Sequence, residues 1–174
     1  MACTLTTGRK LPCKSGVGGL KTVYFADYGT LGATTIASGE LTAIAGTPDL
    51  FQFDIKGNSS LETAINSSRE NGTTFYETTL NLTLTFLEKA TQEELKLIAH
   101  ARPHVFVEDY NGNYFVVGLE HGAEVTGGSI VSGAAMGDLS GFTLTMVAQE
   151  TAPPYFVTST VVTGNASATQ ITPN

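Results

Sequence analysis

The chain contains little charge, no tryptophan and only two cysteines. Charged residues make up 14% of its 174 positions, and nine Lys and Arg against sixteen Asp and Glu give a net charge of −7. Proteins that bind duplex DNA tightly use many Lys and Arg side chains to neutralise phosphates, so the negative net charge argues against a DNA-binding surface. Cys3 and Cys13 have no Cys-x-x-Cys spacing. They predict two reduced structural thiols and no zinc site.

Long hydrophobic runs are also missing. No segment approaches the roughly 18 apolar residues of a membrane-spanning helix, and the N-terminal stretch lacks the apolar run of a secretory signal. We therefore expect a protein made in a cytoplasm, with no membrane partner. Nineteen glycines and abundant threonine favour a loop-rich, mainly β domain. We expect an extended N-terminal arm at residues 1–19, a single β-sandwich domain at 20–163 and a polar tail at 164–174.

Motifs of catalytic and cofactor sites are absent as well. Residues 8–15, GRKLPCKS, imitate a phosphate-binding loop but place Cys13 where the last glycine belongs. His100, His104 and His121 are too scattered along the chain to suggest a metal site. No nucleophile elbow of the form G-x-S-x-G occurs. The expectation is a protein that is not an enzyme and carries no cofactor or metal.

The clearest positive feature is a long alternating segment, residues 73–87. Its apolar row consists of Tyr76, Thr78, Leu80, Leu82, Leu84 and Phe86. Its polar row consists of Glu77, Thr79, Asn81, Thr83 and Thr85 and contains no lysine or arginine. Period-two alternation predicts a strand with one packed and one wet face, and an ordinary solvent face is the simplest interpretation.

One short helix is predicted directly after that strand, at residues 91–102. Thr91 and Glu94 have the spacing of a capping box, and Pro103 ends the segment. Leu95, Ile98 and Ala99 form its apolar stripe. A single helix of about three turns can cover part of a sheet but cannot form an α/β layer.

Shorter alternating segments predict further strands, at residues 20–28, 34–37, 40–45, 50–56, 61–66, 141–149 and 155–162. The segments 50–56 and 61–66 are expected to form an amphipathic hairpin. Residues 67–74 are expected to be a polar loop, and 126–141 a flexible glycine-rich loop. Segment 141–149 directs Phe142, Leu144, Met146 and Ala148 inward, and Thr143, Thr145, Val147 and Gln149 outward.

Residues 104–119 give the clearest hairpin signal. Asn111-Gly112 predicts a two-residue turn, whereas a four-residue turn at 109–112 would shift the register by one. Under the two-residue turn, one face carries Phe106, Phe115, Val117 and Leu119. Both faces are apolar, so the hairpin is expected to be buried within the domain or at a subunit contact.

Charge is unevenly distributed along the chain. Arg9, Lys10, Lys14 and Lys21 lie near the N-terminus, and no basic residue follows Arg102. One end of the chain is therefore cationic and the later half anionic.

Taken in order, these elements resemble the tail tube proteins of long-tailed bacteriophages. The resemblance rests on the amphipathic hairpin, the long strand, the helix beginning TQEEL, the hairpin DYNGNYFVVG, the glycine-rich excursion and the strand GFTLTMVAQE. It covers residues 50–152. The fold is also similar to the inner-tube proteins of contractile injection and type VI secretion machines.

The resemblance implies a β-sandwich or partial barrel with one flanking helix, assembled as stacked rings, typically hexamers, in a virion tail. Double-stranded DNA and a tape-measure protein would occupy the lumen, and terminator, baseplate or sheath proteins could be further partners. The implied lumen residues are Glu77, Thr79, Asn81, Thr83, Thr85, Thr143, Thr145 and Gln149, and Gln52, Asp54 and Glu62 could join them. An acidic or neutral wall lets DNA slide, and only Lys56, at a strand end, is an exception.

Stacked rings need two different, complementary surfaces. The arm residues Arg9, Lys10 and Lys14 are expected to dock on an acidic surface of a neighbouring subunit. The loop residues expected at the same inter-ring contact are Ser67, Ser68, Asn71 and Gly72. The alternative function is a monomeric or trimeric decoration or adhesion module on a virion or cell surface, which would bind through the glycine-rich loop and the apolar hairpin.

Overall fold

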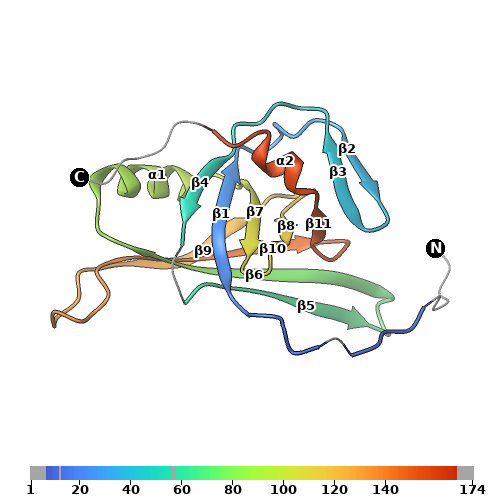
Figure 1. Ribbon diagram of the computed structural model, residues 1–174, viewed down its shortest axis with the longest axis horizontal. Coiled ribbons are helices and arrows are strands. Elements are labelled where there is room, and N and C mark those ends of the chain that lie inside the picture. Colours follow the sequence, from blue (N-terminus) through green and yellow to red (C-terminus); the bar gives the residue numbers. More distant parts are fainter. Residues whose placement is uncertain (1–6, 12, 56–57, 168–174) are drawn as a thin grey trace.

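Two β-sheets packed face to face form the body of the protein, as Figure 1 shows for the computed structural model. The structure describes residues 7–11, 13–55 and 58–167. Buried side chains from both sheets, among them Val23, Val107, Leu80 and Met146, belong to one hydrophobic cluster between them. The predicted fold class, a mainly β sandwich with a short helix beside it, is confirmed.

The larger sheet has seven strands in the order β2-β3-β11-β8-β7-β1-β4. These are β1 (Leu20–Ala26), β2 (Thr34–Ala37), β3 (Glu40–Ile44), β4 (Phe51–Asp54), β7 (His104–Asp109), β8 (Tyr114–Val117) and β11 (Tyr155–Val157). All residues of β1 except Lys21 are buried, because the sandwich core covers one face of this sheet and a second cluster covers the other. Helix α2 (Ser159–Thr163) contributes Val161 and Val162 to that second cluster.

The smaller sheet has four antiparallel strands in the order β5-β6-β10-β9. They are β5 (Ser60–Ser68), β6 (Thr73–Thr85), β9 (Glu124–Val131) and β10 (Gly141–Glu150). The predicted alternation holds in β6, where Leu80, Leu82 and Leu84 are buried. Phe86 leaves the apolar row, because its backbone φ of 73° breaks the strand and the side chain is 78% exposed.

Helix α1 (Lys89–His100) begins two residues before the predicted start, and the capping box is wrong. Glu88 is the N-cap residue and makes no side-chain cap hydrogen bond. Thr91 lies inside the first turn, where its hydroxyl donates to Glu88 Oε2 at 3.4 Å and caps no backbone N–H group. Leu95 and Ile98 are buried as predicted, whereas Ala99 is exposed.

The predicted hairpin of residues 50–66 does not form. Strand β4 pairs with β1 at the edge of the seven-stranded sheet, and β5 pairs with β6 in the other sheet. The chain therefore crosses between the sheets after Ile55. The physical reason is partner choice: Phe53 of β4 packs edge-on against Phe25 of β1, with ring centres 5.2 Å apart.

Both predicted loops are shorter than expected. Strands β5 and β6 extend to Ser68 and Thr73, so the turn between them covers only residues 69–72. Residues 126–131 of the glycine-rich stretch belong to β9, and residues 132–140 connect this strand to β10. Gly128 allows close pairing there, since a Cβ atom would lie 2.6 Å from the carbonyl oxygen of Thr143.

The predicted final strand, residues 155–162, is also corrected. Only β11 is a strand, and the chain then turns into α2. The start of the polar tail lies against Leu50, whose N–H group donates to the carbonyl of Asn165 at 3.0 Å. Ser167 N–H in turn donates to the carbonyl of Leu50 at 2.8 Å.

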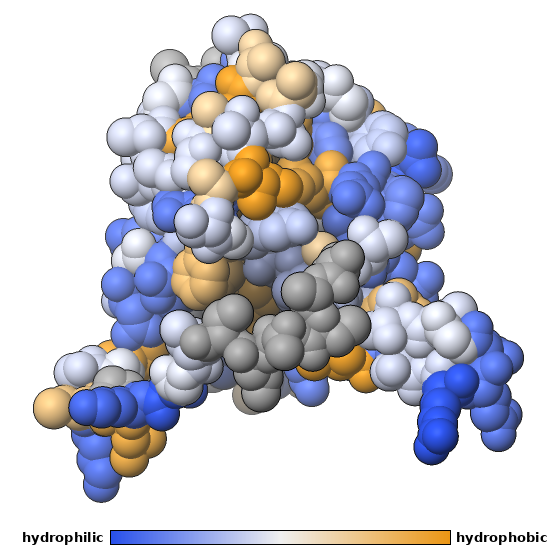
Figure 2. All heavy atoms as spheres, turned by 90° about the vertical axis from the view of Figure 1, so that its right-hand side faces the viewer, coloured by the Kyte–Doolittle hydropathy of each residue, from blue (hydrophilic) through white to orange (hydrophobic). Residues whose placement is uncertain are grey.

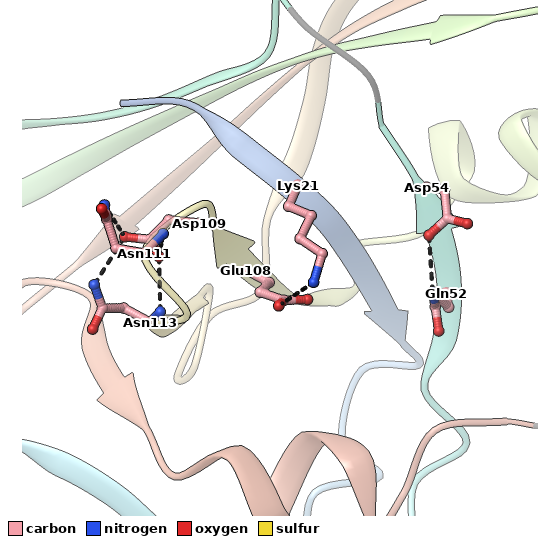
Figure 3. Close-up of polar contacts among 7 residues, drawn as sticks. All are labelled: Lys21, Gln52, Asp54, Glu108, Asp109, Asn111 and Asn113. Carbon is pink, nitrogen blue, oxygen red and sulfur yellow. Dashed lines mark hydrogen bonds and ion pairs between the residues drawn. The ribbon is translucent and has the colours of Figure 1, made fainter. Parts of the chain in front are cut away.

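The hairpin of β7 and β8 has a three-residue turn, so neither predicted register is correct. Asp109 N–H donates to the carbonyl of Asn113 at 3.0 Å, which leaves residues 110–112 in the turn. The Asp109 carboxylate fixes this longer turn by accepting hydrogen bonds from Asn111 and Asn113 (Figure 3). Burial raises the pKa of Asp109, but the hydrogen bonds from both asparagines outweigh it and hold the pKa below its ordinary value.

This register separates the four hairpin residues that were expected to share a face. Phe115 and Val117 point into the core between the sheets, whereas Phe106 and Leu119 point into the cluster beneath α2. Phe106 is fully buried and Val117 is 2% exposed. The hairpin is thus buried within the protomer.

His104 at the start of β7 joins two loops and is buried. Its Nε2 accepts a hydrogen bond from Gly29 N–H at 3.1 Å, so the Nδ1 nitrogen carries the proton donated to the Gly118 carbonyl at 2.6 Å. Burial lowers the pKa of His104 below 6.5, against the weaker opposing effects of Gly118 and Glu150. The structure therefore holds the neutral imidazole.

We expect the free energy of unfolding to fall as the pH drops from about 6.5 through the lowered pKa of His104. The folded state binds this proton more weakly than the unfolded state, so added protons favour unfolding. Denaturant titrations at pH values above and below 6.5 measure the effect. His104→Gln should flatten the dependence in this window, whereas His100→Gln and His121→Gln, at exposed positions, should retain it. An unchanged dependence in His104→Gln would refute this assignment.

Candidate functional site: the polar face of the four-stranded sheet

The eight residues expected to face a lumen lie on one face of the four-stranded sheet, opposite the core. Cross-strand pairing places Thr143 beside Thr83, Thr145 beside Asn81 and Gln149 beside Glu77. Thr79 and Thr85 continue the row along β6, opposite Val147 and Gly141. The buried neighbours in both strands point the other way, into the core. We call this surface the polar face.

Hydrogen bonds between side chains tie β6 to β10 across the polar face. Thr145 Oγ1 donates to Asn81 Oδ1 at 2.9 Å. Gln149 Nε2 donates to Glu77 Oε2 at 2.7 Å. Both contacts pair polar side chains of β6 and β10 with each other, without a partner from outside the sheet. The polar face is therefore a surface of polar side chains that are paired with one another.

The two outer strands extend this surface. Glu62 of β5 lies opposite Thr79 and joins the polar face, as expected. Ser129 of β9 also joins it, and its hydroxyl lies 2.7 Å from that of Thr143. The sequence does not indicate Ser129 as a member of this face, because the glycines of its segment predict a loop. Its strand signal was the pattern of β-branched residues in EVTGGSIV, which the glycines obscured.

Gln52 and Asp54 do not belong to the polar face. They lie on β4 in the other sheet, where Gln52 Nε2 donates to Asp54 Oδ1 at 2.9 Å (Figure 3). Phe53 between them packs against the core, so both polar side chains point to the opposite side of their sheet. Lys56 lies outside the described residues.

The polar face carries negative charge and no positive charge. Strands β5, β6, β9 and β10 contain no lysine or arginine, and Glu62, Glu77 and Glu124 lie on this face. Such a surface offers phosphate groups no ion-pair partner.

Both outer strands are open edges within the described part of the chain. β5 pairs only with β6, and β9 pairs only with β10. Unpaired backbone groups along an edge can pair with a strand from another chain. The sheet therefore has two edges available for association.

The N-terminal arm is exposed throughout its described part, residues 7–11 and 13–19. Arg9, Lys10 and Lys14 are all exposed. The arm is attached at its base, where Val17 N–H donates to Asn111 Oδ1 at 2.9 Å and Asn111 Nδ2 donates to the Val17 carbonyl at 2.7 Å. Beyond this attachment it runs toward the end of the molecule that carries the β5–β6 turn (Figure 1).

The other inter-ring candidates lie at the end of the β5–β6 hairpin. Ser67 Oγ is 3.1 Å from Thr74 Oγ1, and Asn71 N–H donates to Ser68 Oγ at 3.3 Å. Gly72 adopts a φ of 63°, which closes the turn. Figure 1 shows this turn and the described start of the arm at the same end of the molecule.

Figure 2 views the molecule from that end. Two projections extend below the body, and hydrophilic side chains reach the end of each. Hydrophobic side chains are exposed higher on the body, on the side where β2 and β3 lie in Figure 1. Both projections thus carry hydrophilic side chains, and the left-hand one also exposes hydrophobic side chains.

One ion pair occurs among the described residues, between Lys21 Nζ and Glu108 Oε1 at 2.8 Å (Figure 3). Its hydrogen bond to Glu108 raises the pKa of Lys21. Burial raises the pKa of the neighbouring Tyr24 to about 12. Both groups keep their protons at neutral pH, and the ion pair connects β1 to β7.

Neither a metal-binding cluster nor a membrane-spanning helix occurs in the described ranges, residues 7–11, 13–55 and 58–167. No group of three or more His, Cys, Asp or Glu side chains there could hold a metal ion. No helix in these ranges is both long and apolar enough to cross a membrane.

No protein-family model matches the chain, and no curated protein sequence matches it. Function is therefore inferred from the polar face, the two open edges and the arm.

Proposed function

We propose that the protein is the subunit of a phage tail tube, a hollow structure of stacked rings through which double-stranded DNA passes. The observation that carries this proposal is a polar face without cations on a sheet that is open at both edges. Under this proposal the protein is a structural component of the virion tail and not an enzyme.

The strand directions are compatible with ring formation. β5 is antiparallel to β6, β6 to β10, and β10 to β9, so β5 and β9 run in opposite directions. A copy related by rotation about a ring axis can therefore present its β5 antiparallel to β9, which continues the same hydrogen-bonding pattern. Repetition around the axis, six times in the ring that we propose, closes the sheet into a barrel.

The polar face would line the lumen of that barrel. Glutamates and threonines there would repel or ignore phosphate groups, and DNA would pass without being held. A tape-measure protein would occupy the same space before the DNA. The apolar face of the sheet already packs on the core, so the polar face is the one left to meet the lumen.

Stacking of rings would use the cationic arm. A head-to-tail contact needs two different surfaces, and the arm offers exposed positive charge that no described acidic side chain of the same chain neutralises in an ion pair. We propose that it docks on an acidic surface of a subunit in the next ring. The β5–β6 turn would lie at the same contact, and terminator, baseplate or sheath proteins would meet the ends or the outside of the tube.

The alternative decoration or adhesion module rested on two features. These were the glycine-rich loop and the apolar hairpin of residues 104–119. The structure places residues 126–131 of the glycine-rich segment in β9, leaves residues 132–140 as a connecting loop, and buries the hairpin in the protomer. The buried hairpin no longer supports the alternative, which would have to bind through the loop of residues 132–140 alone.

Electron microscopy of the purified protein tests the proposal. We expect hollow rods built from stacked rings, with a sedimentable fraction that grows with protein concentration. Separate globular particles at every concentration, with the mass of a monomer or trimer, would rule the tube out.

A further inference from the structure

A groove runs between helix α1 and the edge strand β9. It encloses about 870 Å³. Leu95, Phe142 and Leu144, all at most 9% exposed, contribute to its lining. Ile130 of β9 also lines the groove and is 61% exposed. The groove thus has an apolar floor and an incompletely covered wall, and its α1 side also carries Lys89, Gln92, Glu93 and Lys96.

This groove lies beside an open strand edge. β9 pairs with β10 on one side only, and six of its eight residues are exposed. A strand that pairs with β9 would direct alternate side chains beneath α1 and the others onto the polar face. The groove therefore fits an extended segment that is apolar on one face and polar on the other.

Strand β5 of a second copy has this pattern. Leu61 and Ile65 lie on the side of β5 that faces the core, and Glu62 lies on the polar face. Leu61 packs partly against the core of its own chain, whereas Ile65 remains 68% exposed. β5 has nine residues and β9 eight, so the two strands match in length.

We propose that the groove between α1 and β9 receives the apolar side of β5 from a second copy, with Ile65 as its principal contact. The inference rests on the proposed function in that it requires self-association. Helix α1 then has a second role beside covering its own sheet, because it covers part of the neighbour's strand. Burial of an isoleucine contributes on the order of tenfold or more in affinity.

Two substitutions on opposite sides of the contact test the proposal. Ile65→Glu places a charge on β5, and Ala99→Trp fills the groove from α1. Each should weaken self-association at least about tenfold in sedimentation velocity, since a charge or a bulky ring would displace the apolar contact. Both positions are exposed in the protomer, so its thermal unfolding should change little.

The matched controls are Ile36→Glu and Leu97→Trp. Ile36 is 42% exposed on β2 of the other sheet. Leu97 is 63% exposed and lies two positions from Leu95, on the other side of the helix. Both control variants should assemble like the unaltered protein.

Mixing the two defective variants gives the sharpest result. Ile65→Glu retains an intact groove, and Ala99→Trp retains an intact β5, so the mixture can form one native contact per pair. We expect a one-to-one dimer in the mixture at protein concentrations at which neither variant alone self-associates. Absence of this dimer would overturn the proposed contact.

The proposed groove contact and the proposed tube can be refuted separately. Tubes that form normally from both Ile65→Glu and Ala99→Trp would overturn the groove contact and leave the tube standing. Small discrete oligomers of the unaltered protein, dissociated by either variant, would support the groove contact and overturn the tube.

Discussion

Reversal of Arg9, Lys10 and Lys14 to glutamate is expected to abolish stacking of rings while the protomer stays folded. The three changes alter the charge by −6 and take the net charge from −7 to −13. All three side chains are exposed. Repulsion would then replace attraction at an acidic docking surface. Electron microscopy and sedimentation should show single rings or protomers in place of tubes, and thermal unfolding should be unchanged.

A charge-conserving triple variant is the matched control: Arg9→Lys, Lys10→Arg and Lys14→Arg should still give tubes. Added salt should shorten tubes of the unaltered protein, because exposed charges are screened within about 10 Å at 0.1 M salt. Tubes of normal length and normal salt resistance from the triple glutamate variant would remove the arm from the inter-ring contact.

The double substitution Thr79→Lys, Thr83→Lys is expected to slow or block DNA release while tubes still assemble. Both residues lie on the polar face, away from the core. Each added cation that meets a phosphate contributes about 0.9 to the slope of log affinity against log salt for duplex DNA. A ring would multiply this effect by the number of its subunits. DNA release from triggered particles, followed over time at several salt concentrations, measures the delay.

Thr34→Lys with Thr35→Lys is the matched control. These threonines are exposed on β2 of the other sheet, and the pair of substitutions adds the same charge. Release should proceed normally in the control. Thr83 Oγ1 donates to the Asn58 carbonyl at 3.2 Å, so thermal unfolding must confirm that the test variant keeps its fold. Normal release from intact Thr79→Lys, Thr83→Lys tubes would show that the polar face does not line the lumen.

The sequence predicted the burial of side chains correctly where the alternating pattern lies within a single strand. The alternation along β6 and β10 predicted which side chains are buried, because successive residues of a strand point to opposite faces. The face that carries Thr79, Thr83 and Thr145 could therefore be assigned from sequence. The polar rows of β6 and β10 lie side by side because the two strands pair. This pairing joins distant segments, and neither segment specifies it by itself.

Sequence reasoning failed where the choice of partner decides the structure. Residues 50–56 and 61–66 are consecutive alternating segments, which favours a hairpin, yet each pairs with a different sheet. Gly127 and Gly128 suggested a loop, although pairing with β10 holds them in a strand. The register of the β7–β8 hairpin depended on the hydrogen bonds of Asp109, which Asn111-Gly112 did not reveal.

By itself, the sequence determined the mainly β class, the buried and polar rows of single strands, and the lack of positive charge on the row from Glu77 to Thr85. These are local properties, set by side-chain chemistry and the two-residue period of a strand. Only the tertiary structure decided that the threonine rows of β6 and β10 form one surface, that β5 and β9 remain open, and that α1 leaves a groove beside β9. Those features depend on contacts between distant segments, because pairing partner and register are selected by packing across the whole sandwich.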